Sequence, residues 1–145
     1  MLRIVLDTSI FVSSLLVKEG PAAQVLGAWR ARRYLLIDSP DLAAEITATL
    51  RYPRIRRRYR ITEDDIQAMV GLLEADAILV PGTVDVAGSV PEDPDDEIVL
   101  ACAVEGDADL VVSGDQHLLN LGRFQGIEIT TVRAFMERLE DEAAP

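Results

Sequence analysis

The sequence has very little of three residue types that often carry chemistry, with one cysteine (Cys102), one histidine (His117) and one lysine (Lys18). A single cysteine cannot form an internal disulfide, and no set of cysteines and histidines has the spacing of a zinc site. This usage is typical of a reducing compartment, so we expect the protein to be cytoplasmic.

Long apolar runs are also missing. The most apolar stretch, residues 4–17, is interrupted by Asp7, has only Arg3 as a preceding basic residue and is not followed by a small-residue cleavage site. It is shorter than the roughly 20 apolar residues that a membrane span needs. We therefore expect neither an export signal nor a membrane partner.

The chain has 145 residues, of which 49% are hydrophobic, and this length predicts one globular domain. Its net charge of −11 disfavours a nucleic-acid partner at first sight. The charge is unevenly distributed, however, because residues 1–60 hold 11 basic and 5 acidic side chains and residues 61–145 hold 3 and 20. Halves that differ this much indicate an acidic region and a basic region with separate roles.

Short apolar runs alternate with segments of helical periodicity, which predicts a parallel sheet covered by helices on both faces. We expect an α/β fold, a three-layer α/β/α sandwich around a mostly parallel sheet of 4–5 strands, in one domain over residues 1–139 with a short frayed tail at 140–145. The expected strands are residues 2–6, 34–37, 77–80, 110–113 and 127–129. Helices are expected at residues 10–17 and 22–31, or as one bent helix over both, and at residues 39–50, 62–75, 116–121 and 131–139. A further helix is expected to begin at residues 93–94, and its middle, residues 98–104, is apolar on every side.

Several acidic residues follow the expected strands. Strand C-termini and the N-termini of the following helices share one edge of such a sheet, and sites form there. Asp7 and Asp115 follow two strands, Asp95 and Asp96 lie in the first turn of the buried helix, and Glu45 lies at the border of an apolar helix face. Each acid has an ordinary alternative role, as a helix cap or a charge at the rim of the core.

Carboxylates that converge on one cleft repel one another unless a cation is present. A cluster of oxygen ligands without cysteine favours a hard cation, so we expect Mg²⁺ or Mn²⁺. Such ions can activate water and stabilise the leaving oxygen in phosphodiester hydrolysis.

Four short motifs, in this order and spacing, resemble those of the PIN-domain ribonucleases, and in particular the VapC-like toxins of toxin–antitoxin modules. They are L-D-T-S-I-F at residues 6–11, L-A-A-E-I at 42–46, D-P-D-D-E-I-V-L-A-C-A at 93–103 and V-S-G-D-Q-H-L-L at 112–119.

The resemblance implies a metal-dependent endoribonuclease with a cognate antitoxin, often a homodimer. Asp7, Glu45, Asp96 and Asp115 match the catalytic acids of the family, and among them Asp7, Asp96 and Asp115 would bind the metal. Thr8, Ser9, Ser113 and Asp95 match supporting positions. Glu97 departs from the family pattern, since related sequences often carry Asn there.

The densest basic stretch lies at residues 51–60, with two interleaved tyrosines. Arginines can hold phosphates and tyrosines can stack on unpaired bases, so the stretch is a possible RNA contact. The alternatives are a solvated surface, or a surface that pairs with an acidic antitoxin or a second subunit, since arginine suits all these uses. Its arginines are Arg51, Arg54, Arg56, Arg57, Arg58 and Arg60.

Other residues are given structural roles. His117, beside two leucines, is interpreted as structural, and Cys102 as a buried small residue. Two functions compete with the ribonuclease: a PIN-fold module that binds RNA or protein without catalysis, and a phosphoacceptor signalling domain. The second needs a lysine at a late strand end, whereas the only lysine is Lys18.

Overall fold

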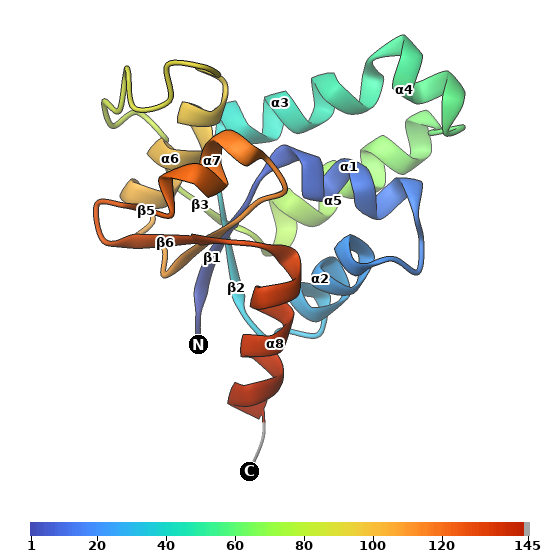
Figure 1. The fold of residues 1–145 in the computed structure, drawn as a ribbon. Helices are drawn as coiled ribbons and strands as arrows, with labels where there is room; N and C mark the ends of the chain where they lie inside the picture. The colour runs from blue at the N-terminus through green and yellow to red at the C-terminus, as the bar shows by residue number, and fades with distance from the viewer. Residues whose placement is uncertain (144–145) are drawn as a thin grey trace.

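The computed structural model describes residues 1–143 and contains a mostly parallel six-stranded sheet (Figure 1). The strands are β1 (Arg3–Leu6), β2 (Leu35–Asp38), β3 (Ile78–Leu79), β4 (Leu110–Val112), β5 (Arg123–Phe124) and β6 (Ile127–Thr130), in the order β3-β2-β1-β4-β6-β5. Each neighbouring pair is parallel except β5 and β6, which are antiparallel. The expected α/β/α architecture is therefore confirmed, with one strand more than predicted.

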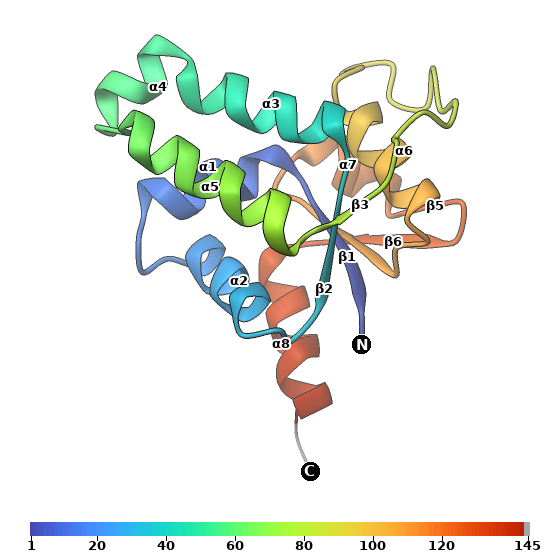
Figure 2. The same ribbon diagram turned by 180° about the vertical axis from the view of Figure 1, so that it is seen from behind.

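Helices cover both faces of the sheet. Helix α6 (Asp96–Glu105) packs against β1, β2 and β4. On the other side, α1 (Thr8–Leu16) packs against α2 (Pro21–Arg30) and α3 (Pro40–Arg51), and α3 packs against α5 (Glu63–Asp76), as Figures 1 and 2 show. This enclosure explains why Ile4, Val5 and Leu6 of β1 are fully buried.

The helix boundaries follow from local chemistry. Ser39 accepts a hydrogen bond from the N–H of Leu42 and is followed by Pro40, so α3 begins where the sequence predicts. Thr62 and Asp65 form a complete capping box at the start of α5. The break at Gly20 separates α1 from α2, which decides between two helices and one bent helix.

The structure differs from the prediction at three helices. Residues Pro53–Arg58 form a short helix, α4, that was not predicted. Helix α6 begins only at Asp96, because residues 93–95 form a turn in which the Asp93 carbonyl accepts from the N–H of Asp96 (3.1 Å).

At the C-terminus, α8 (Val132–Ala143) continues four residues past the predicted end at residue 139. Ion pairs at i,i+4 spacing, Arg133 with Glu137 and Arg138 with Glu142, extend along it. Residues 140–143 of the expected tail are thus helical, and residues 144–145 lie outside the described part.

The sixth strand also was not predicted. Strand β5 has only two residues and follows α7 (Gln116–Leu121), and it turns back into β6 through Gln125 and Gly126, both with positive φ (47° and 83°). The two residues of β5 stand in the polar segment G-R-F-Q-G, which has no apolar or alternating run, whereas β3 lies within the apolar run A-I-L-V. Over residues 1–143, no helix has the length and apolar character needed to cross a membrane.

Candidate active site at the carboxyl edge of the sheet

Strands β1 and β4 end side by side and bring Asp7 next to Ser113. Leu6 is in register with Val112, and the N–H of Asp7 donates to the carbonyl of Val112 (3.0 Å). The Ser113 hydroxyl donates to Oδ2 of Asp7, while Oδ1 accepts from the N–H of Ser9 (3.0 Å) and caps α1. Both oxygens of Asp7 are therefore held in place by the local backbone and by the neighbouring strand.

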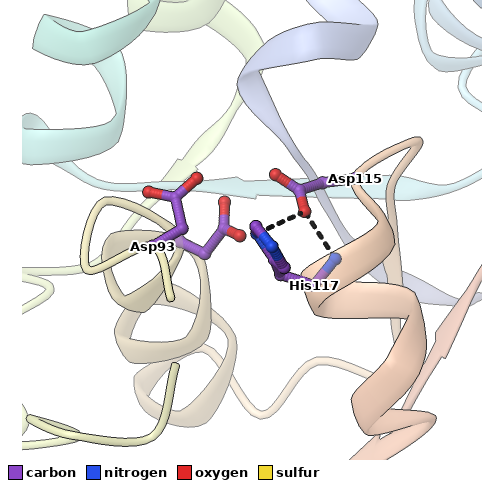
Figure 3. Close-up of side chains that lie close together, drawn as sticks. Asp93, Asp115 and His117 are labelled. Carbon is purple, nitrogen blue, oxygen red and sulfur yellow. Dashed lines mark hydrogen bonds and ion pairs between the residues drawn. The ribbon is translucent and has the colours of Figure 1, made fainter. Parts of the chain in front are cut away.

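Asp115 is held at the start of α7. Its N–H donates to the Ser113 hydroxyl (2.8 Å), and its Oδ1 accepts from the N–H of His117 (2.7 Å). The same Oδ1 lies 3.6 Å from Nδ1 of His117, so the imidazole turns back toward the carboxylate (Figure 3).

Asp96 begins α6 and is 7% exposed. Among the described residues, its buried Oδ2 has no hydrogen-bond partner. Burial raises the pKa of Asp96 to about 8, and the charges of Asp115, Asp93 and Asp7 add to the effect. This carboxyl is in a site that strongly disfavours its charged form unless a cation is close.

Glu45 reaches the same edge from α3. Its Oε2 accepts a hydrogen bond from the Thr8 hydroxyl (3.0 Å). Burial raises the pKa of Glu45 above its usual value; the Thr8 bond opposes this, and the charges of Asp95, Asp7 and Asp93 reinforce it. Asp7 and Asp93 are therefore close enough to both Glu45 and Asp96 for their charges to raise the pKa of each.

A cleft of about 330 Å³ joins these side chains. All four predicted catalytic acids line it, together with the supporting residues Thr8, Ser9 and Asp95. The rest of its lining is Val12, Ser13, Thr49 and Asp93. Ser113 lies behind it, buried between Asp7 and Asp115.

One group of side chains in this region fits a metal ion. Asp93, Asp96, Asp115 and His117 each offer one ligand atom, and these atoms lie within 4.8 Å of one another. Three carboxylates with one imidazole suit Mn²⁺, and the carboxylates suit Mg²⁺. The unpartnered Oδ2 of Asp96 is the observation that supports this fit.

This group differs in part from the predicted metal ligands. Asp96 and Asp115 belong to it, whereas Asp7 lines the cleft but is not a member. Asp93 and His117 were not among the predicted site residues. The signals were present in the sequence, since Asp93 is three residues before Asp96 and His117 two after Asp115.

Helix capping, the ordinary role considered for these acids, accounts for Asp7 and Asp115 but not for Asp96. Asp7 and Asp115 do cap helices. Asp96 caps nothing, and the residue at the N-cap of α6, Asp95, makes no capping hydrogen bond with its side chain. The case for a functional cluster therefore depends most on Asp96.

Glu97, which departs from the family pattern, holds the preceding loop. Its Oε1 accepts hydrogen bonds from the N–H groups of Gly88 (2.9 Å) and Val90 (3.4 Å). This loop, residues 88–93, ends at Asp93, so Glu97 helps to fix the position of Asp93.

Known proteins share the fold of this chain. A family model described as "PIN domain" matches residues 3–117. No curated protein matches the chain in sequence. Among solved structures, the chain is similar to one in the crystal structure of VapBC2 from Rickettsia felis bound to a DNA fragment from their promoter. The TM-score is 0.60 at 11% identity, over 89% of this chain and 98% of that one. The fold is therefore shared with that structure, and the family match over residues 3–117 shows that the chain belongs to the PIN-domain family.

Proposed function

We propose that the protein is a metal-dependent endoribonuclease and the toxin of a toxin–antitoxin pair. The observation that carries the proposal is the buried Asp96, whose Oδ2 has no hydrogen-bond partner among the described residues, in a cleft that Asp7, Glu45, Asp93 and Asp115 also line. The likeness to VapBC2, a toxin–antitoxin complex, supports the toxin role and an antitoxin partner.

Acidic residues of the cleft have distinct roles in the proposed reaction. Asp93, Asp96 and Asp115 would hold Mg²⁺ or Mn²⁺, with Asp7 beside them. When bound, the ion supplies positive charge that activates water and stabilises the charge developing on the phosphodiester. Glu45, held by Thr8, orients the attacking water, and Ser113 keeps Asp7 in place. Water adds to phosphorus, one P–O ester bond breaks, and the leaving oxygen takes a proton.

The cellular context is also part of the proposal. We propose a cytoplasmic protein, from its single cysteine, and a homodimer, from the resemblance to VapC-like toxins. Size measurement in solution tests the dimer, and a mass near 15.9 kDa for the native protein would contradict it.

The chemistry is tested by removing the charge of a carboxyl while keeping its shape. Asp96→Asn and Asp7→Asn should each abolish Mg²⁺-dependent cleavage of a mixed RNA substrate, with a thermal transition in EDTA no lower than that of the parent. Asp76→Asn, which changes an exposed acid at the end of α5, is the matched control and should cleave normally. Unchanged cleavage by Asp96→Asn would refute the assignment.

A PIN-fold module without catalysis is the main alternative. Calorimetric titration with Mn²⁺ distinguishes the two, because a metal-dependent enzyme must bind the ion. If titration with Mn²⁺ gives no heat of binding and the protein cleaves no RNA, the ribonuclease proposal fails and the binding module is the function that stands.

A further inference from the structure

The arginines of residues 51–60 fall into two groups in the structure. Arg51 and Arg56 both pair with Glu63 of α5, Arg56 through Nη1 and Oε2 at 3.6 Å. Within the part of the chain that the structure describes, no carboxylate pairs with Arg54, Arg57, Arg58 or Arg60. Arg51 of α3 and Arg56 of α4 thus both pair with Glu63 of α5, and the other four arginines have no paired carboxylate in that part of the chain.

Three of the unpaired arginines share one face of α4. Arg54, Arg57 and Arg58 stand at i, i+3 and i+4, the spacing that places side chains on one side of a helix, and all are exposed. The other side carries Ile55, which packs against the core, and Arg56, which pairs with Glu63. We call Arg54, Arg57 and Arg58 the free arginine face.

The cleft of the candidate active site extends toward this face. Beyond Glu45 its lining includes Thr49, the next turn of α3, and Val12 and Ser13 of the adjacent α1. Helix α3 continues directly into α4, as both views of the ribbon show (Figures 1 and 2). Tyr52 lies seven positions after Glu45, and at 1.5 Å per residue this is about 10 Å along the helix axis.

Exposed aromatic side chains flank the arginines. Tyr52 is 56% exposed between α3 and α4, and Tyr59 is 41% exposed after α4, with the Arg58 guanidinium 5.5 Å from its ring centroid. Base stacking on tyrosine requires unpaired bases, and arginine forks bind phosphate oxygens. The combination fits a single strand better than a duplex.

We propose that the free arginine face binds phosphates of single-stranded RNA three or more nucleotides from the bond cleaved in the cleft. The number follows from about 10 Å along α3 and a rise of about 3.4 Å per stacked nucleotide. The proposal rests on the proposed ribonuclease function. RNA is favoured over an acidic protein because the face continues the cleft that contains the carboxylates, and because the exposed Tyr52 and Tyr59 beside it can stack on bases.

The test compares Arg54→Gln/Arg57→Gln with a control, Arg30→Gln/Arg32→Gln, that removes the same charge. Arg30 and Arg32 are exposed near the end of α2, and within residues 1–143 they too pair with no carboxylate. Both pairs are placed in an Asp96→Asn background, so that RNA is bound and not cleaved. The probe is a labelled, unstructured RNA of about 12 nucleotides, followed by fluorescence anisotropy at several salt concentrations.

The variant of the free arginine face should bind about tenfold more weakly, and its slope of log K against log salt should fall by about 1.4, or 0.7 per lost phosphate contact. The control should change neither quantity beyond a small common shift. In an otherwise native chain, the same variant should lower kcat/KM for the long RNA and leave cleavage of a trinucleotide unchanged, since a trinucleotide does not reach α4.

Equal affinity and equal salt slope in the two variants would overturn the proposal. So would an annealed duplex that binds the parent as tightly as the single strand does and loses as much affinity in the variant of the free arginine face. Loss of binding to a co-expressed antitoxin, with RNA binding intact, would also overturn it and assign the face to protein contact. If the native chain cleaves no RNA while binding still depends on Arg54 and Arg57, the ribonuclease proposal fails and the phosphate contact stands. Circular dichroism melting verifies that both variants are folded.

Discussion

Two buried carboxyls, Asp38 and Asp96, show how neighbours decide the role of a residue. Asp38 ends β2 and Asp96 begins α6, both at the carboxyl edge of the sheet. Both have carboxylate oxygens without hydrogen-bond partners among the described residues. Asp38 is 1% exposed, at the end of β2, and does not line the cleft. Asp96 has three acids around it and lines the cleft. Only the second arrangement has the ligands that a cation needs.

At Asp96, removal of the charge and binding of a metal ion should each stabilise the fold, because each relieves a buried, unpaired charge. In EDTA above about pH 8, Asp96→Asn should raise the free energy of unfolding by about 1–3 kcal/mol, because a buried unpaired charge is removed. Saturating Mn²⁺ should stabilise the parent by about 2.7 kcal/mol at 100 times its Kd, and the variant far less. Urea unfolding with and without Mn²⁺ measures both, and a parent that Mn²⁺ does not stabilise would count against the metal site.

Asp38 should make stability depend on pH. Burial raises its pKa from 3.8 to about 6, so the folded state binds the proton more tightly than the unfolded state. The free energy of unfolding should therefore fall as pH rises from about 4 to about 6, by about 2–3 kcal/mol from this residue.

Asp38→Asn should flatten that part of the profile, which urea unfolding at a series of pH values measures. Asp76→Asn, on the exposed end of α5, should leave the profile unchanged. An identical slope in the parent and Asp38→Asn would show that Asp38 does not carry the effect.

Among the elements, the loop between β3 and α6 determines where Asp93 lies. Two glutamates of α6 hold it: Glu105 accepts from the N–H groups of Gly82 and Thr83, and Glu97 accepts from those of Gly88 and Val90. The helix that begins with Asp96 therefore also anchors the segment that delivers Asp93.

Glu97→Ala should loosen this loop. Hydrogen exchange at the amides of Gly88 and Val90 should become faster by about tenfold, corresponding to the roughly 1.4 kcal/mol of a lost hydrogen bond to a charged group. RNA cleavage should fall as well. Glu97→Gln keeps a carbonyl acceptor and should restore much of both, whereas Glu92→Ala, at an exposed residue of the same loop, should affect neither. Equal protection in Glu97→Ala and the parent would contradict the anchoring role.

At the scale of the whole molecule, the last helix, α8, packs against α2 and against Tyr34, which directly precedes β2. Phe135 of α8 is fully buried and meets Tyr34 edge-on, with ring centroids 5.1 Å apart. The Tyr34 hydroxyl donates to the carbonyl of Val25 in α2 (2.7 Å). Residues from both ends of the chain thus share one core, which supports our proposal of one domain over residues 1–139.

Phe135→Ala should lower the free energy of unfolding by about 3–5 kcal/mol, because it removes a large buried ring and leaves a cavity. Urea curves from Trp29 fluorescence and from circular dichroism should still coincide, as expected for a single cooperative unit. Arg133→Ala, at an exposed position of α8, should cost no more than about 0.5 kcal/mol. Separate transitions for the two probes would contradict the single domain.

The sequence by itself determined the features that depend on nearby residues. Capping at Ser39, Thr62 and Asp115 and the buried strand before Asp7 are decided by side chains within a few positions, so local patterns predict them. The alternation of strands and helices then places Asp7 and Asp115 at one edge. The family motifs then singled out Asp96 rather than Asp95, and Glu45, as expected catalytic residues.

Only the tertiary structure decided which side chains meet. Asp93 and His117 join Asp96 and Asp115 because a loop and a helix turn bring them together. Glu63 of α5 pairs with Arg51 and Arg56 and leaves the other arginines free. These contacts depend on how separate elements pack, and the local rules of capping and periodicity carry no information about distances between elements.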